Sequence, residues 1–226
     1  MRCWVYVDGF NFYHGAAKRT GHKWVDLLKL SQQVRSGDSI ERIKYFTALV
    51  ERRTDDPDQQ KRQRLYWRAL ATIPCLERIE GQFSRHPRSM PLYDSVQTLE
   101  ELARRGCNVE GVRPIMMRML RSEEKGTDVN LATHLVHDAH RTPPADSFEG
   151  ALVISNDSDL AEAIRIVTRE VGKRVYVCVP DSSSRIGRLA AVATGVFGLN
   201  ASVLRDCLFP DTLADARGPF CKPPNW

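Results

Sequence analysis

The chain lacks several patterns that would assign it to familiar classes of protein. None of its six cysteines are spaced as CxxC, which argues against a redox motif or a common zinc site. No apolar run is longer than a strand, whereas a membrane-spanning helix needs about 20 apolar residues. The first apolar stretch leads directly into Asp8-Gly9 without a signal-peptide cleavage pattern. We therefore expect a reduced, cytoplasmic protein without a membrane segment.

Two other sites are not favoured by the sequence. Cys75 and His86 are spaced unlike any common pair of zinc ligands, so we do not expect a zinc site there. No GxGxxG follows the first predicted strand, which argues against a dinucleotide-binding enzyme.

The composition is that of an ordinary globular protein. With 226 residues, 42% hydrophobic and 27% charged, the chain is long enough to bury one sizeable core. A net charge of +5 and a pI near 9.0 give a mild preference for polyanions.

The order of apolar runs predicts alternating strands and helices. Buried strands are expected at residues 3–7, 40–50, 151–154 and 174–179, and helices at 24–34, 57–71, 128–140, 159–171 and 185–193. Residues 76–92 are predicted as a strand followed by an irregular loop, 95–105 as a helix, and 109–120 as extended. This alternation predicts a single α/β domain over residues 1–206, in which helices flank a central, mostly parallel sheet. The Pro- and Gly-rich segment 207–226 is expected to be an irregular tail.

Acidic residues follow or face the predicted strand ends. Asp8 ends the first strand, Asp157 and Asp159 follow the 151–154 strand, and Asp128 begins a helix whose N-terminus can face the same edge. Ligands of open parallel sheets bind beyond the carboxyl ends of the strands. Clustered carboxylates repel one another unless a cation neutralises them, and Mg²⁺ and Mn²⁺ prefer oxygen ligands. The pattern predicts a divalent metal site suited to phosphodiester hydrolysis.

Each acid also has a purely structural interpretation. Asp8-Gly9 is a common turn sequence, Asp128 and Asp157 suit helix N-caps, and Asp159 suits the first turn of a helix. The metal site is the better explanation because it accounts for all four acids at one sheet edge.

Three sequence blocks resemble the NYN domain, a PIN-like nuclease fold also described as LabA-like or DUF88. They are VYVDGFNFYHG (5–15), EEKGTDVNLATHLVHDA (123–139) and ALVISNDSDLAEAI (151–164), in the order of that family and followed by its next strand at 172–180. The resemblance covers most of the chain up to about residue 180. The final LFPD and KPPNW stretches look like the tail of one bacterial branch.

The resemblance implies a metal-dependent ribonuclease-like site, with RNA as the partner. The implied catalytic residues are Asp8, Asn11, Asp128, Asp157 and Asp159, and the four aspartates would also be the ligands of Mg²⁺ or Mn²⁺. Ser155 and Asn156 match the family's strand-end residues that brace the site, and they also suit a turn. Independently of the resemblance, Lys125 precedes a Gly-Thr pair at a helix start, where it can meet a substrate phosphate.

Other functions stay open at this point. The chain can be a non-catalytic module that keeps the fold and binds RNA or a protein. A phosphatase of the haloacid dehalogenase type is disfavoured because it needs a second Asp where this chain has Phe10. A homodimer is compatible with the resemblance, since PIN-like folds often pair.

Overall fold

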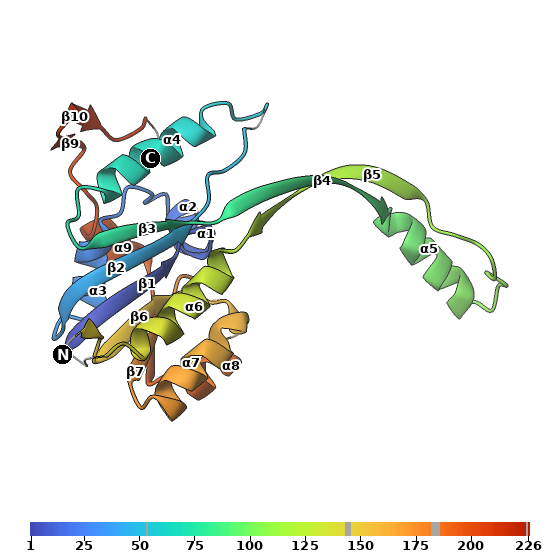
Figure 1. Cartoon of the computed structure of the whole chain (residues 1–226). Helices are drawn as coiled ribbons and strands as arrows, with labels where there is room; N and C mark the ends of the chain where they lie inside the picture. The colour runs from blue at the N-terminus through green and yellow to red at the C-terminus, as the bar shows by residue number, and fades with distance from the viewer. Residues whose placement is uncertain (53, 143–145, 182–185, 225) are drawn as a thin grey trace. The chain divides into compact units, whose positions relative to one another are not determined.

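A computed structural model describes the chain except residues 53, 143–145, 182–185 and 225 (Figure 1). Six strands form a parallel sheet in the order β3-β2-β1-β6-β7-β8. Their bounds are Arg2–Asp8 (β1), Ser39–Thr47 (β2), Leu76–Glu80 (β3), Gly150–Ile154 (β6), Arg174–Val179 (β7) and Gly195–Gly198 (β8). The α/β class and the parallel sheet flanked by helices, predicted from the sequence, are confirmed.

Strand β1 separates two hydrophobic cores. Its side chains alternate, so that Cys3, Val5 and Val7 enter one core while Trp4 and Tyr6 enter the other. Both sets are almost fully buried because β1 lies between β2 and β6, with helices on both faces. This explains why residues 3–7 of β1 are all apolar and do not alternate with polar residues.

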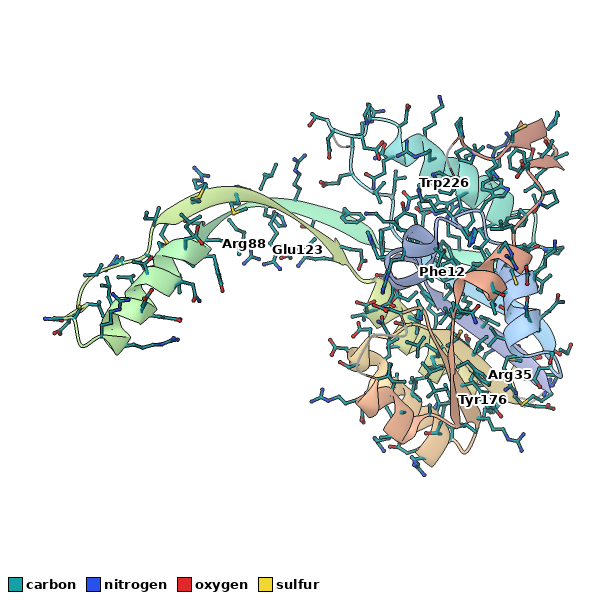
Figure 2. The ribbon with its side chains drawn as sticks, turned by 180° about the vertical axis from the view of Figure 1, so that it is seen from behind. Phe12, Arg35, Arg88, Glu123, Tyr176 and Trp226 are labelled. Carbon is teal, nitrogen blue, oxygen red and sulfur yellow. The ribbon has the colours of Figure 1, made fainter. Side chains whose placement is uncertain are left out.

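Helices cover both faces of the sheet (Figure 1). One core is lined by residues of α1, the π-helix η1, α3, α4 and α9, with bounds Gly9–Phe12, Tyr13–Ala17, Leu27–Val34, Gln59–Leu70 and Ala201–Asp206; the short α2 is Lys18–Thr20. The other is lined by residues of α6, η3, α7, η4 and α8, with bounds Thr127–Ala139, Ser158–Leu160, Ala161–Arg165, Ile166–Glu170 and Gly187–Val192. At the end of α3, the Arg35 guanidinium lies 3.7 Å from the ring centroid of Tyr176 on β7 (Figure 2).

The contacts divide the chain into two compact units. The larger comprises residues 1–82 and 125–226, and the smaller, which we call the insertion unit, is Phe83–Glu124. The insertion unit contains helix α5 (Tyr93–Arg104) and nearly all of the paired strands β4 (Gln82–Pro91) and β5 (Met116–Lys125). The prediction of an irregular loop before residue 92 is therefore wrong, because pairing with β5 makes most of that segment a strand.

The buried face of helix α6 differs from the apolar face that the sequence predicts. The apolar spacing of the 128–140 helix predicts Val129 on one face with Leu135 and Val136, but Val129 is 69% exposed, while Asp138 is 1% exposed. Asp138 accepts hydrogen bonds at Oδ2 from the Tyr6 hydroxyl at 2.9 Å and from the Lys44 ammonium at 2.5 Å. The ion pair satisfies a carboxylate that would otherwise be costly to bury. A partner on a distant strand thus overrides the apolar pattern of the helix.

The last segment is not irregular as predicted. Residues Thr212–Asp215 (β9) and Gly218–Cys221 (β10) form an antiparallel pair, and Phe209 and Phe220 join the core. The Arg68 side chain of α4 donates to both carboxylate oxygens of Asp215, at 2.8 and 2.6 Å. Buried aromatic rings and this two-point contact order a segment whose Pro and Gly content suggested disorder. The proposed domain boundary at residue 206 stays a prediction.

Candidate functional site

Asp8 and Ser155 lie at the carboxyl ends of two neighbouring parallel strands. In the register of the sheet, Val7 is opposite Ile154, the last residue of β6. Asp8 is the last residue of β1, and the chain leaves β6 at Ser155. Both side chains are buried. The parallel register therefore brings together two residues that are 147 positions apart in the sequence.

A chain of hydrogen bonds fixes the Asp8 carboxylate. Its Oδ1 accepts from the Asn11 backbone N–H at 2.9 Å, and its Oδ2 accepts from the Ser155 hydroxyl at 3.0 Å. Ser155 Oγ in turn accepts from the Asp157 N–H at 3.0 Å, and Asn11 Oδ1 accepts from the Asn156 N–H at 3.1 Å. Two strand-end loops are thereby joined around one carboxylate. The structure brings five of the predicted site residues into this network.

Electrostatics connect Asp8 with two further acids. The pKa of Asp8 is raised from 3.8 to about 6, mainly by burial and in part by the negative charges of Asp128 and Asp157, against the opposing hydrogen bonds from Asn11 and Ser155. Asp128 is in the first turn of α6, and its charge acts on Asp8, so this helix start lies near the strand ends. Three carboxylates from three separate segments therefore share one electrostatic environment.

Two predicted residues are placed differently. Asp159 is exposed, and its N–H donates to Asp157 Oδ1 at 3.0 Å, so Asp157 caps the short helix η3. The capping interpretation of Asp157 is thus correct, and it leaves the second carboxylate oxygen, Oδ2, outside the cap. Lys125 is exposed at the end of β5. The next residue, Gly126, has a φ of 95° and is the N-cap of α6.

Two residues at the end of β2 were not predicted to belong to the site. Asp8 is opposite Phe46 in the sheet, so Tyr45 and Thr47 flank its partner position. Burial raises the pKa of Tyr45, and the nearby charge of Asp8 contributes in the same direction, whereas a hydrogen bond to Thr47 opposes it. Because β2 is also a parallel strand adjacent to β1, the strand-end rule should have identified Thr47.

The donor set suits a hard divalent cation. Every candidate ligand is an oxygen atom, and a cation would relieve the repulsion that raises the pKa of Asp8. In the described residues, however, no group of three or more His, Cys, Asp or Glu side chains is arranged to hold one ion. Mg²⁺ commonly uses one or two carboxylates and several waters, so the residues fit an ion bound largely through water.

The six-stranded parallel sheet with helices on both faces defines the chain as an α/β protein. The chain belongs to the NYN domain family, whose family model matches residues 2–197. The resemblance inferred from the three sequence blocks is thereby confirmed. In the described residues, no helix is both long and apolar enough to cross a membrane.

Two known proteins are similar to this chain. The chain is 28% identical to 6-hydroxy-3-succinoylpyridine 3-monooxygenase HspA of Pseudomonas putida, over an alignment that covers the whole chain and 75% of that protein. A solved structure of a protein of unknown function from Vibrio parahaemolyticus aligns with a TM-score of 0.50 and 14% identity, covering 92% of this chain and 96% of the other. The second likeness concerns the fold alone.

Proposed function

We propose that this protein is a Mg²⁺- or Mn²⁺-dependent ribonuclease that cleaves RNA phosphodiester bonds at the Asp8 site. The main support is the Asp8 carboxylate, which is held by Ser155 and Asn11 and is under the negative charge of Asp128 and Asp157. A bound divalent ion would supply an activated water and stabilise the leaving oxygen. Asp8 and Asp157 would hold the ion, with Asp128 and Asp159 contributing through water.

The remaining residues have positioning and binding roles in this proposal. Ser155 and the Asn11 N–H each fix one oxygen of Asp8, and the remaining lone pairs of these oxygens would face the ion or its water. Asn11 uses its side-chain oxygen to accept from Asn156 N–H, which keeps the two loops in register around the substrate. Lys125, exposed before the start of α6, would contact a phosphate of the RNA.

The test is cleavage of end-labelled single-stranded and hairpin RNAs with Mg²⁺, with Mn²⁺ and with EDTA. Asp157→Asn should lose at least a hundredfold in rate, because the carboxylate that holds the ion is gone. Asp211→Asn is the matched control, since the side chain of Asp211 is 80% exposed and pairs with Lys222. Intact RNA under every condition, from folded protein, contradicts the proposal and favours a module that binds RNA without metal.

The relative named a monooxygenase gives a second candidate function. In this second candidate function, the chain would insert one oxygen atom of O₂ into a C–H bond of a pyridine ring, and the other atom would leave as water, formed with two electrons from a reductant and two protons. The alignment over the whole chain and an aromatic cavity beside Asp8, described below, support it. Oxygen consumption with a hydroxypyridine carboxylate and reduced nicotinamide or flavin distinguishes it from hydrolysis, which consumes no O₂.

We also propose that the insertion unit pairs with a second copy of the chain. It carries all but one of the exposed large hydrophobic residues in the described chain, and α5 has no buried residue. Such a surface is typical of an interface. The helix also carries alternating charge, with Glu100 and Glu101 paired to Arg104 and Arg105, so two copies running in opposite directions can place acid opposite base.

The dimer is tested by the mass in solution at micromolar concentration. Met117→Glu with Met119→Glu should convert a dimer into a monomer, because two charges enter the apolar strand. Val129→Glu is the control, since Val129 is an exposed hydrophobic residue outside the insertion unit. If the wild-type protein is monomeric at 100 μM, roughly the upper range of such measurements, pairing with a second copy of the chain is ruled out.

A further inference from the structure

An aromatic cavity opens next to the acidic site, within the larger of the two units. It is lined by residues of α1, η1, the end of β2 and α4, together with Trp226. Figure 2 labels Phe12 and Trp226, which come from opposite ends of the chain and both line this space. Its volume, as the space open to the centres of water molecules, is about 70 Å³. That is roughly five times what one water needs, which suits a six-membered ring.

The walls of the cavity are largely apolar, with several aromatic rings. Tyr45 and Tyr66 meet edge to face at 6.5 Å between ring centroids, and Tyr66 lies 5.8 Å from Trp226. The Tyr66 hydroxyl donates to the Val25 carbonyl at 2.9 Å, so its polar atom is already satisfied. Aromatic walls of this kind favour a flat, unsaturated ligand over an aliphatic one.

One polar atom in the lining has no assigned partner. Gln59 Oε1 is buried, and no hydrogen bond to it exists in the part of the chain that the structure describes. The neighbouring Gln63, by contrast, uses both ends of its amide, accepting from Val50 N–H at 2.9 Å and donating to the Ala48 carbonyl at 2.9 Å. A buried acceptor without a donor is costly, so such an atom calls for a partner such as an ordered water, an ion or a ligand. Gln59 is therefore ready to accept from a ligand N–H.

The rest of the lining indicates where the charge of such a ligand would lie. Lys23 and Arg62 are the lysine and arginine of the lining, and Arg62 Nη2 already donates to Asp56 Oδ2 at 2.5 Å, which offsets part of the Arg62 charge. Gly9, the residue that follows Asp8 in the sequence, also lines the cavity. Cations near the ring position suit a ligand whose ring carries an anionic group.

We propose that this cavity binds a planar nitrogen heteroaromatic ring that carries an N–H donor and an anionic substituent. The ring enters between the aromatic walls, its N–H donates to Gln59 Oε1, and its anionic group faces Arg62 and Lys23. A uridine nucleotide offers a ring N–H and an anionic phosphate attached through its ribose, and a free hydroxypyridine carboxylate in its pyridone form offers a ring N–H and a carboxylate. The assignment is separate from the proposed cleavage, because it needs neither metal nor a scissile phosphate.

The experiment is calorimetric titration in EDTA with uridine, cytidine, adenosine and guanosine 5′-monophosphates and with 6-hydroxynicotinate as probes. At least one probe should bind saturably. A tenfold preference for a mononucleotide identifies the cavity as a base subsite, and a tenfold preference for 6-hydroxynicotinate identifies it as a small-molecule site. Absence of saturable binding of every probe at 10 mM, by folded protein, overturns the proposal.

Gln59→Leu tests the polar contact with two readouts. This substitution should weaken binding of the preferred probe about three- to tenfold, because one neutral hydrogen bond is lost. The melting temperature without ligand should not fall, since the substitution removes an atom that has no partner within the described chain. Gln32→Leu, at an exposed position of α3, is the control and should change neither. Unchanged affinity in Gln59→Leu overturns the assignment of the acceptor.

These outcomes remain distinct from those of the cleavage assay. Asp157→Asn, which should abolish cleavage, should bind the preferred probe as the wild type does. Ring binding without RNA cleavage would leave the cavity assigned and refute the nuclease, and cleavage without ring binding would do the opposite.

Discussion

Replacing Asp8 by Asn should make the metal-free protein more stable at pH 8. The Asp8 side chain is almost fully buried, and its pKa rises from 3.8 to about 6 mainly because burial disfavours the charged form. The unfolded chain releases this proton near pH 4, whereas the folded protein keeps it to about pH 6. Stability therefore falls as the pH rises through this window and stays low above it.

The magnitude follows from the size of the shift. A rise of about two pKa units, at 1.36 kcal/mol per unit, corresponds to about 3 kcal/mol of lost stability above pH 6. Asn removes the charge but no longer accepts from the Ser155 hydroxyl as the carboxylate does, which costs about 1 kcal/mol. The expected net gain is about 2 kcal/mol at pH 8, and it should reverse sign near pH 4.

Urea unfolding in EDTA between pH 4 and pH 8 measures this difference directly. Asp211→Asn, at an exposed position, should stay within about 0.5 kcal/mol of the wild type throughout. A difference between wild type and Asp8→Asn that does not change with pH would falsify the reasoning, because it would mean that Asp8 does not titrate in this window. Mg²⁺ at a hundred times its dissociation constant should raise the free energy of unfolding of the wild type by about 2.7 kcal/mol. The same concentration should stabilise Asp8→Asn much less.

Three further changes test the fold around the site. Asp138→Ala should destabilise the protein by about 3–5 kcal/mol, because it leaves the Lys44 ammonium buried without its carboxylate. Gly9→Ala should cost about 1–3 kcal/mol in urea unfolding, since its Cβ would lie 2.7 Å from a backbone oxygen of β2. Gly37→Ala, with no neighbour within 4 Å, should cost less than about 0.5 kcal/mol. Arg68→Ala should make residues 207–226 susceptible to limited proteolysis, because the hairpin loses its two-point contact with α4.

Each of these has a result that contradicts it. An Asp138→Ala variant as stable as the wild type would show that the buried pair contributes nothing beyond the cost of its burial. Equal effects of Gly9→Ala and Gly37→Ala would mean that the close approach to β2 is not required. An intact tail in Arg68→Ala would mean that the buried aromatic rings hold the hairpin without the ion pair.

The central sheet was predictable because it depends on local apolar runs. Residues 3–7, 151–154 and 174–179 are apolar nearly throughout, and a parallel strand with both faces covered has that composition. The strand-end rule then located Asp8 and Asp157 without any knowledge of the register. Helix α5 was predicted nearly at its observed bounds, with Gly106 after its end at a φ of 79°.

The missed features depend on partners that are remote in the sequence. Strand β4 contains Pro87 and Pro91 and has no apolar alternation, so only its pairing with β5 makes it a strand. Asp138 was assigned no role because its two partners lie on β1 and β2, more than 90 positions away. Strand β8 and helix α9 are short, and their apolar residues show no periodicity long enough to recognise.

The sequence by itself determined the class of fold, the family and the identity of the acids, because these follow from short segments that carry their own pattern. Tertiary structure decided which acid is buried and which is exposed. It also created the aromatic cavity, whose walls come from four elements and the last residue of the chain. Burial and proximity arise only when distant segments pack together, so no local pattern can specify the pKa of Asp8 or the unpaired oxygen of Gln59.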